Sequence, residues 1–224
     1  MTTKKLLLSL SVGFAVTYGF TIQANALNLD RGLASSFALN TYKHSLVLAS
    51  ADADGQKAKD MIEQMGDKAI SFLSDDAMSM DQKEKEFRKL LRSSFDMETI
   101  GRFALGRNWK AASDAQKKEY QKLFENLVVE VYSARFNDYN GQKFEVASFQ
   151  NTGDKDITVT SYIVPDTGSK VQVDWRVRNR NGQYKIVDVI IEGVSMAVTQ
   201  RSDFSSVIQR GGGDVEVLLA HLRK

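Results

Sequence analysis

Two aspartates in the second half of the chain are the residues best placed to act as a catalytic base. Asp174 and Asp188 lie in stretches that alternate or mix with valine and isoleucine, as the strands of a half-buried sheet do. Burial among apolar side chains raises the pKa of a carboxyl group, as in isomerases that use a carboxylate in a cavity. Asp174, however, alternates with glutamine and arginine, so an ion pair on a polar face is the simpler interpretation. Asp188 shares its strand face with Ile186 and Ile190, so both interpretations, a catalytic base and an ion pair, stay open for it.

Other patterns for catalysis or metal binding are weak. The histidines, His44 and His221, have no second ligand at metal-binding spacing, and the chain has no cysteine, so no zinc site is expected. The run G-V-S-M-A around Ser195 lacks the second glycine of a nucleophile elbow, and we expect Ser195 to cap a helix. The glycines at 211–213 follow no strand and precede no Lys-Ser/Thr pair. They are predicted to break a helix rather than to bind phosphate.

The strands that carry the two aspartates form the clearest element in the sequence. Residues 170–178 alternate apolar and polar side chains, residues 183–192 are apolar on both faces, and Asn181-Gly182 between them supplies the positive φ angles of a tight hairpin. Two earlier strands are predicted at 142–149 and 156–164. Four consecutive strands predict an antiparallel meander, whose apolar face helices must cover.

Helical periodicity occupies the chain on both sides of these strands. A helix is predicted from Gln56 to the Asp75-Asp76 pair, and Asp81 with Glu84 is interpreted as a capping box that opens the next. Asp96 is predicted to cap a short helix, and Ser113 with Gln116 to open the longest one, of about 25 residues. Further helices follow the last strand. The sequence therefore predicts an α+β fold with N-terminal helices, a four-stranded antiparallel curled sheet and C-terminal helices, with an open end for a ligand.

The N-terminus has the pattern of an export signal. Two lysines precede an apolar run to Ile22, and Ala24-Asn25-Ala26 is a small-x-small cleavage site, so residues 1–26 are predicted to be a signal peptide cut after Ala26. An uncleaved membrane anchor is the alternative, although the run is near the lower length limit for a span. Residues 27–55 hold no period for long and are predicted to be a flexible segment before a domain at 56–224.

Charge and composition exclude one class of function. The chain has 30 lysines and arginines and 28 aspartates and glutamates, and both lysines before Leu6 lie in the predicted signal. The mature chain is therefore formally neutral, which argues against a general binder of nucleic acid. Arg176, Arg178 and Arg180 form a basic row, which is either a solvated sheet face or a contact for acidic headgroups or partners.

Aliphatic and aromatic residues are abundant on every predicted element. An ordinary core explains most of them. The alternative is that helices and sheet do not close on each other and leave a dry pocket for a long apolar ligand.

Several motifs resemble those of one family. They are the block from Phe95 to Lys110 (F-D-M-E-T-I-G-R-F-A-L-G-R-N-W-K), the helix 120–136, Tyr139-Asn-Gly141, Val173-Asp-Trp-Arg176 and Ile191-Glu-Gly-Val-Ser-Met196 followed by Thr199-Gln-Arg201. Together they resemble the MlaC-type, toluene-tolerance family of periplasmic lipid carriers. The similarity covers about residues 58–224.

The resemblance implies a protein of the periplasm that binds phospholipid and has no enzyme activity or cofactor. Its partners would be an inner-membrane MCE-domain protein of an ABC transporter and an outer-membrane lipoprotein–porin complex, and its role would be to maintain outer-membrane lipid asymmetry. The implied fold is a curled sheet related to nuclear-transport-factor-2-type (NTF2-like) cones, with helices that clasp the acyl tails. Carriage of a hopanoid or other polycyclic lipid, a cone-fold enzyme that uses Asp174 or Asp188, and a periplasmic adaptor with a filled core remain alternatives.

Candidate site residues follow from the pattern and the resemblance together. The predicted tail-contacting wall consists of Phe95, Ile100, Phe103, Trp109, Phe124, Leu127, Tyr132, Val159, Val171, Val173, Trp175, Val189 and Ile191. The residues predicted to contact a headgroup or a partner protein are Arg102, Arg107, Arg176, Arg178 and Arg180.

Overall fold

The computed structural model describes residues 31–153 and 155–224, with side chains from Asp52 onward. The chain divides into two units, Met1–Lys43 and His44–Lys224. The sheet, the cavity and all helices from residue 80 onward belong to the second, together with the first helix from His44 on. The predicted signal peptide lies outside the described residues. Within them, no helix has both the length and the apolar character that a membrane span requires.

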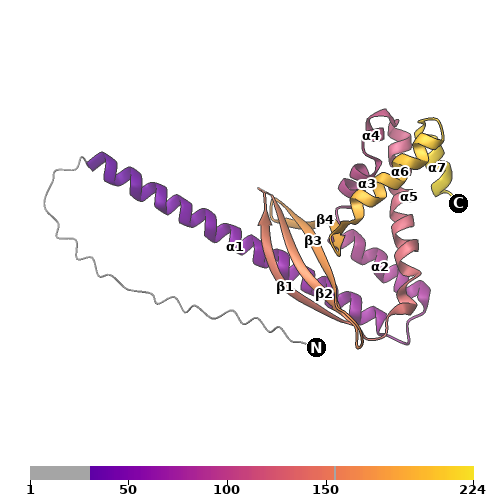
Figure 1. The fold of residues 1–224 in the computed structure, drawn as a ribbon, viewed down its shortest axis with the longest axis horizontal. Coiled ribbons are helices and arrows are strands. Elements are labelled where there is room, and N and C mark those ends of the chain that lie inside the picture. The colour runs from indigo at the N-terminus through magenta and orange to yellow at the C-terminus, as the bar shows by residue number, and fades with distance from the viewer. Residues whose placement is uncertain (1–30, 154) are drawn as a thin grey trace, which may run out of the picture. The chain divides into compact units, whose positions relative to one another are not determined.

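Five antiparallel strands form one sheet in chain order (Figure 1). They are β1 (Lys143–Thr152), β2 (Asp156–Val164), β3 (Val171–Arg180), β4 (Gln183–Ile191) and β5 (Val194–Ser195). The four predicted strands are confirmed, but the prediction of only four was wrong. Glu192 and Gly193 take φ angles of 48° and 80°, and this turn folds β5 back onto the end of β4. The NTF2-like kinship stays a prediction.

The hairpin between β3 and β4 forms as its sequence predicts. Asn181 and Gly182 have φ angles of 54° and 83°, which a two-residue turn between twisted strands requires. The Gly182 N–H donates to Asn179 Oδ1 at 2.8 Å and closes the turn. Strand register then sets the two faces: Val159, Trp175 and Val189 are cross-strand neighbours on the apolar face.

The helices are α1 (Arg31–Leu73), α2 (Met80–Ser94), α3 (Met97–Leu105), α4 (Asn108–Ala111), α5 (Asp114–Ser133), α6 (Met196–Arg210) and α7 (Val215–Leu222), with a 3-10 turn η1 (Phe136–Asp138) before the sheet. The predicted caps at Asp96 and Ser113 are confirmed, and so is Ser195 as the N-cap of α6. The predicted capping box of Asp81 with Glu84 was wrong. Ser79 caps α2 instead, in a reciprocal box with Gln82, because Ser79 immediately precedes the helix whereas Asp81 already lies in its first turn.

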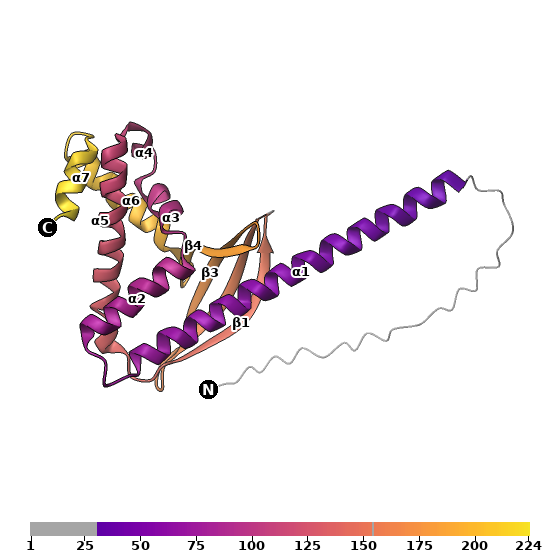
Figure 2. The same cartoon turned by 180° about the vertical axis from the view of Figure 1, so that it is seen from behind.

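Helix α1 begins at Arg31, well before Gln56, so it includes most of the segment predicted to be flexible. Figure 2 shows the later part of α1 beside the sheet. Two residues before Gln56 already contact the strands. Asp54 accepts hydrogen bonds from Tyr184 Oη at 2.6 Å and Asn179 Nδ2 at 3.1 Å. Gly55 lies so close to the ring of Phe149 that a Cβ there would overlap it. The predicted domain boundary at residue 56 stays a prediction.

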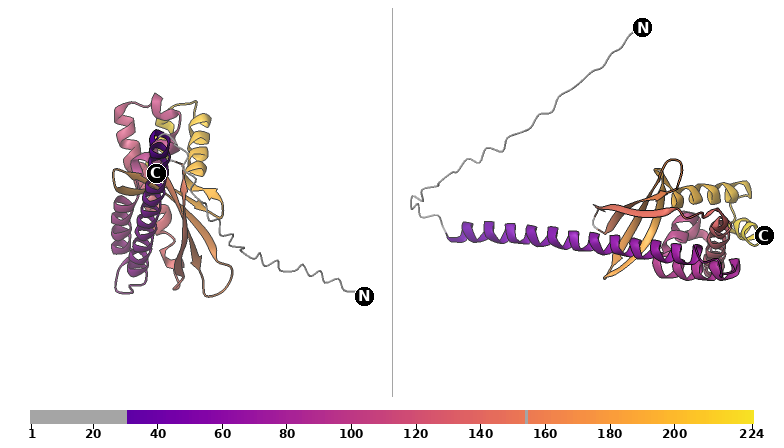
Figure 3. Two further views of the ribbon diagram at one scale, coloured as in Figure 1. Left: turned by 90° about the vertical axis from the view of Figure 1, so that its left-hand side faces the viewer. Right: turned by 90° about the horizontal axis from the view of Figure 1, so that it is seen from below.

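Two separate hydrophobic cores build the second unit. The first joins α1 and α2 to the apolar sheet face through residues such as Ile62, Phe72 and Ile186. The second joins α3, α5, α6 and α7 around Tyr120, Phe124 and others. Figure 3 shows these helices grouped beside one end of the sheet. The short segment that connects α2 to α3 is hydrogen-bonded to β4, since the Asp96 N–H donates to the Ile186 carbonyl at 2.9 Å.

Candidate functional site

An apolar cavity of about 320 Å³ lies where the two cores meet. It is walled by α2, α3, α5, the start of α6 and the apolar face of β2, β3 and β4. Its lining residues are Phe87, Leu91, Phe95, Met97, Ile100, Phe124, Val128, Tyr132, Ile163, Val173, Trp175, Asp188, Val189, Ile191, Met196, Ala197, Thr199 and Gln200.

The cavity exists because neither core fills the space between them. Phe95, Trp175 and Val189 form the fringe of the sheet core, whereas Met97 and Ile100 form the fringe of the helical core. All five are only partly buried although they are apolar. Apolar surface left in contact with water is unfavourable by about 25 cal/mol per Å². A hydrocarbon ligand would therefore gain stability by covering this wall.

The structure brings eight of the thirteen predicted wall residues together around this cavity. These eight are Phe95, Ile100, Phe124, Tyr132, Val173, Trp175, Val189 and Ile191. Seven of them come from α3, α5, β3 and β4, and Phe95 lies between α2 and α3. Their meeting follows from the strand register, from the packing of α3 against β4 and from the packing of α5 against α2 and α3. That they contact lipid stays a prediction.

The other five predicted wall residues do not line the cavity. Val159 is fully buried beneath α1, and Leu127 and Trp109 pack against the helical core. Phe103 is 36% exposed, with the Arg201 guanidinium carbon 5.3 Å from its ring centroid. Val171 lies on the apolar face at the start of β3, opposite the lining residue Ile163. Sequence periodicity alone shows on which face of a helix or strand a residue lies, but it does not show which other element covers that face.

Sequence reasoning missed part of the wall. Phe87 and Leu91 stand four residues apart on α2 and therefore on one face, a signal that was available. Ile163 was available from the alternation of β2. Met196 and Ala197 line the cavity because the Ser195 cap aims the first turn of α6 at it, which needs the three-dimensional path of the chain.

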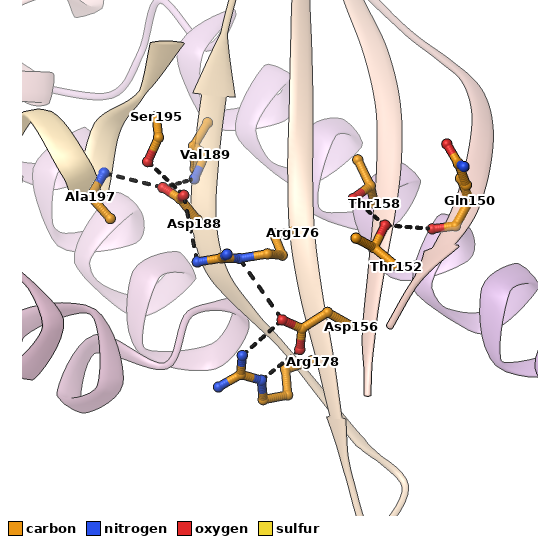
Figure 4. A network of polar contacts seen from close by, with 10 residues as sticks. All are labelled: Gln150, Thr152, Asp156, Thr158, Arg176, Arg178, Asp188, Val189, Ser195 and Ala197. Atoms are coloured by element: carbon orange, nitrogen blue, oxygen red, sulfur yellow. Dashed lines mark hydrogen bonds and ion pairs between the residues drawn. The ribbon is translucent and has the colours of Figure 1, made fainter. Parts of the chain in front are cut away.

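The carboxylate of Asp188 is fully occupied. It is 5% exposed and accepts hydrogen bonds from Ser195 Oγ at 2.7 Å, from its neighbour Val189 N at 2.9 Å and from Ala197 N at 3.1 Å (Figure 4). One nitrogen of Arg176 lies 3.6 Å from its other side. Asp188 therefore joins β4 to the N-terminus of α6, where the helix dipole also favours a negative charge. A carboxylate with four such partners is a structural anchor rather than a free base.

Asp174 also has local partners. It accepts from Thr160 Oγ1 at 2.7 Å and Gln172 Nε2 at 2.9 Å on the polar face of the sheet. The expected ion pair with an arginine was wrong, because the three arginines of β3 turn to other carboxylates. Arg178 makes two bonds of 2.6 and 2.8 Å to Asp156, and Arg180 lies 3.0 Å from Asp96.

The row of arginines thus lies on the polar face, outside the apolar cavity. Arg178 beside Asp156 holds the pKa of that carboxyl below its usual range, chiefly through their hydrogen bonds. Arg102 and Arg107 are exposed on the helical part, and Arg102 lies over the Trp109 ring at 5.9 Å. Among the described residues, no group of three or more histidine, cysteine, aspartate and glutamate side chains is arranged to hold a metal ion.

One buried pair fixes the orientation of the largest wall residue. The indole N–H of Trp175 donates to Ser161 Oγ at 2.8 Å, and that hydroxyl donates to the Val173 carbonyl at 3.1 Å. Ser161 is fully buried. Since the polar edge of the indole is satisfied within the sheet, its apolar surface is free to face the cavity.

Comparisons with known proteins match most of this unit. The family described as MlaC protein matches residues 63–224. The chain is 24% identical over 162 residues to the intermembrane phospholipid transport system binding protein MlaC of Haemophilus influenzae, covering 69% of this chain and 76% of that one. It is 23% identical over 107 residues to the toluene tolerance protein ttg2D of Pseudomonas putida, covering 48% and 50%.

A solved structure shares the fold. It is the phospholipid-binding protein from Ralstonia solanacearum, in complex with a phospholipid, with a TM-score of 0.65 and 23% identity. The match covers 74% of this chain and 94% of that one. At this identity the likeness establishes the fold alone.

Proposed function

Because this chain belongs to the MlaC protein family, we propose that it is a periplasmic carrier that binds phospholipid tails in the cavity between its two cores. The observation that carries the proposal is the apolar wall of that cavity, which eighteen residues from the sheet and four helices form. Only Asp188 among them is charged, and its carboxylate is occupied by α6 and Arg176. Hydrocarbon is the ligand chemistry that such a wall accepts.

The energetics explain why a carrier is needed. A two-tailed lipid exposes about 30 methylene groups to water at about 0.8 kcal/mol each, which exceeds 20 kcal/mol in total. A pocket about as apolar as a bilayer removes most of that barrier. The direction of transfer then depends on partner proteins. A carrier that exchanges lipid equally well with both membranes does not by itself shift the lipid toward either one.

The size of the cavity indicates that it changes on loading. Its volume of about 320 Å³ is near the lower limit for a pocket that takes a drug-sized ligand. A two-tailed phospholipid is larger than such a ligand. We therefore infer that the helical core and the sheet core separate further when tails enter, with the headgroup left at the rim.

The cellular setting is part of the same proposal. We infer export through the signal at residues 1–26, exchange with an inner-membrane MCE-domain protein of an ABC transporter, and exchange with an outer-membrane lipoprotein–porin complex. The consequence would be the maintenance of outer-membrane lipid asymmetry. The names of the relatives in Haemophilus and Pseudomonas, a phospholipid transport binding protein and a tolerance protein, support this setting.

Catalysis has less support than binding. Both aspartates that the sequence offered as bases are engaged, Asp188 with α6 and Asp174 with Thr160 and Gln172. A polycyclic lipid such as a hopanoid remains an alternative ligand of the same wall, and it is distinguished by the mass of the extracted molecule.

The deciding experiment is native mass spectrometry of the protein purified from the cell envelope, followed by lipid extraction. We expect an added mass equal to one or more phospholipids. Ile163→Asp places a charge in the wall at a side chain that is already 39% exposed, and should lower the loaded fraction several-fold. Val194→Asp is the matched control, because Val194 is 54% exposed outside the wall. Recovery of bare polypeptide from all samples would contradict the proposal.

A further inference from the structure

Three hollows on the outer surface adjoin one another around a single side chain. Their volumes are about 360, 370 and 600 Å³, and Arg92 near the end of α2 lines all three. The first and third also share Met97 and Glu98 at the start of α3. Together they form a trough bounded by α2, α3, α5 and the β3–β4 hairpin, which we call the Arg92 trough.

The Arg92 trough is strongly basic for a chain that is nearly neutral. Its lining contains ten lysines and arginines against four aspartates and glutamates, whereas the whole sequence has 30 against 28. The basic residues come from three directions: α2 supplies Lys85, Arg88, Lys89 and Arg92, α5 supplies Lys117, Lys118 and Lys122, and the hairpin supplies Arg178, Arg180 and Lys185. Three of the six excess charges are offset by carboxylates just outside the lining, since Glu84, Asp114 and Asp156 pair with Arg88, Lys117 and Arg178. The remaining excess gives this concave surface a positive potential.

Some of these charges are already compensated, and others are open to a ligand. Arg88 and Arg92 both lie against Glu125, at 3.4 and 2.8 Å, and so tie α2 to α5. Lys85, Lys118 and Lys122 are exposed. Arg92 and Arg180 pair with the largely buried carboxylates of Glu125 and Asp96, which are 19% and 15% exposed, but their own side chains are 65% and 56% exposed. The guanidinium N–H groups that face water can also donate to carboxylates of a ligand.

The form of the surface favours a protein segment over a membrane. A lipid leaflet is nearly flat and touches what protrudes, whereas these basic groups surround adjoining depressions. An extended chain with several carboxylates can lie in a depression and reach three basic walls at once. The walls also differ from the lipid cavity, where Asp188 alone is charged.

We propose that the Arg92 trough is a docking site for an extended acidic segment of a partner protein. It goes beyond lipid binding, since it needs no lipid and uses a different surface. The trough nevertheless touches the cavity, because Phe95 and Met97 line both. A segment bound in the trough would therefore contact Phe95 and Met97, the same residues between α2 and α3 that line the lipid cavity.

Fluorescence anisotropy with a labelled peptide of alternating glutamate and alanine tests the proposal on the full mature chain. We expect binding that weakens as ionic strength rises, and no binding of the same peptide with glutamine in place of glutamate. Lys85→Glu/Lys118→Glu/Lys122→Glu reverses three exposed charges without breaking the Glu125 pairs. It should weaken binding by about tenfold or more.

The matched control reverses the same number of charges elsewhere. Lys57→Glu/Lys143→Glu/Lys155→Glu changes three exposed lysines on α1, at the start of β1 and in the β1–β2 turn. All three lie outside the hollows, and the variant should shift the affinity by less than about threefold. Equal losses in both variants would show that net charge alone binds the peptide and would overturn the proposal. So would an absence of peptide binding at low salt, or binding to phosphatidylglycerol vesicles in its place.

Discussion

At the scale of single residues, the cavity depends on how Trp175 is held. Its indole N–H has one partner, the fully buried Ser161 hydroxyl. Ser161→Ala removes that acceptor and leaves a buried donor unpaired, which should lower the free energy of unfolding by about 1–3 kcal/mol. Urea unfolding followed by tryptophan fluorescence measures this change. Ser206→Ala removes an exposed hydroxyl on α6 and should stay within about 0.5 kcal/mol; an equal loss in both would contradict the assigned role.

A second residue-level prediction concerns acid. The pKa of Asp156 is lowered in the folded protein, first by its hydrogen bonds with Arg178, from an ordinary value of 3.8. Its ionised form therefore stabilises the fold fully above that value, and the contribution is lost as pH falls through the lower folded pKa. Asp156→Asn should destabilise the protein at pH 7, and its difference from the wild type should shrink at pH 3. Chemical unfolding at both pH values checks this, and a difference that grows in acid would contradict it.

At the scale of elements, α6 is positioned by one carboxylate from the sheet. Asp188→Asn keeps the shape of the side chain but removes the charge that Ser195, Ala197 and Arg176 share. Removing the charge of one member of a buried, hydrogen-bonded ion pair leaves its partners without compensation, and this should lower the free energy of unfolding by about 3 kcal/mol. Hydrogen exchange should rise first in the opening turn of α6. Asp174→Asn, at a partly exposed site with neutral partners, should lose about 1 kcal/mol or less and serves as the control.

The elements also show where sequence reasoning succeeds and where it ends. The four long strands, the Asn181-Gly182 turn and the Ser113 box were predictable because each depends on residues close in the chain. Strand β5 was missed because it is two residues long and exists only by pairing with β4. The wall was predicted in part for the same reason: Val173 and Trp175 follow from alternation, whereas Met196 and Val128 enter through the packing of helices far apart in sequence.

At the scale of the whole second unit, two cores share one boundary, and that boundary is a cavity rather than a packed seam. Unfilled apolar space lowers stability, because the surrounding side chains lose contact partners. A ligand that binds only the folded state restores those contacts and raises stability with its concentration. The delipidated protein should therefore unfold at a lower temperature than the loaded one, and the difference should depend on added phospholipid.

A substitution that fills the cavity separates this effect from other causes of ligand stabilisation. Val189→Phe adds a ring inside the wall and should reduce both lipid uptake and the rise in melting temperature that phospholipid produces. Val131→Phe makes the same change on α5 at a side chain that is 48% exposed outside the wall, and should leave both unchanged. Overpacking alone would lower the melting temperature of the delipidated Val189→Phe protein while lipid uptake stayed normal. That result would mean that phospholipid enters elsewhere, because a tail in the cavity and a ring at position 189 would compete for the same space.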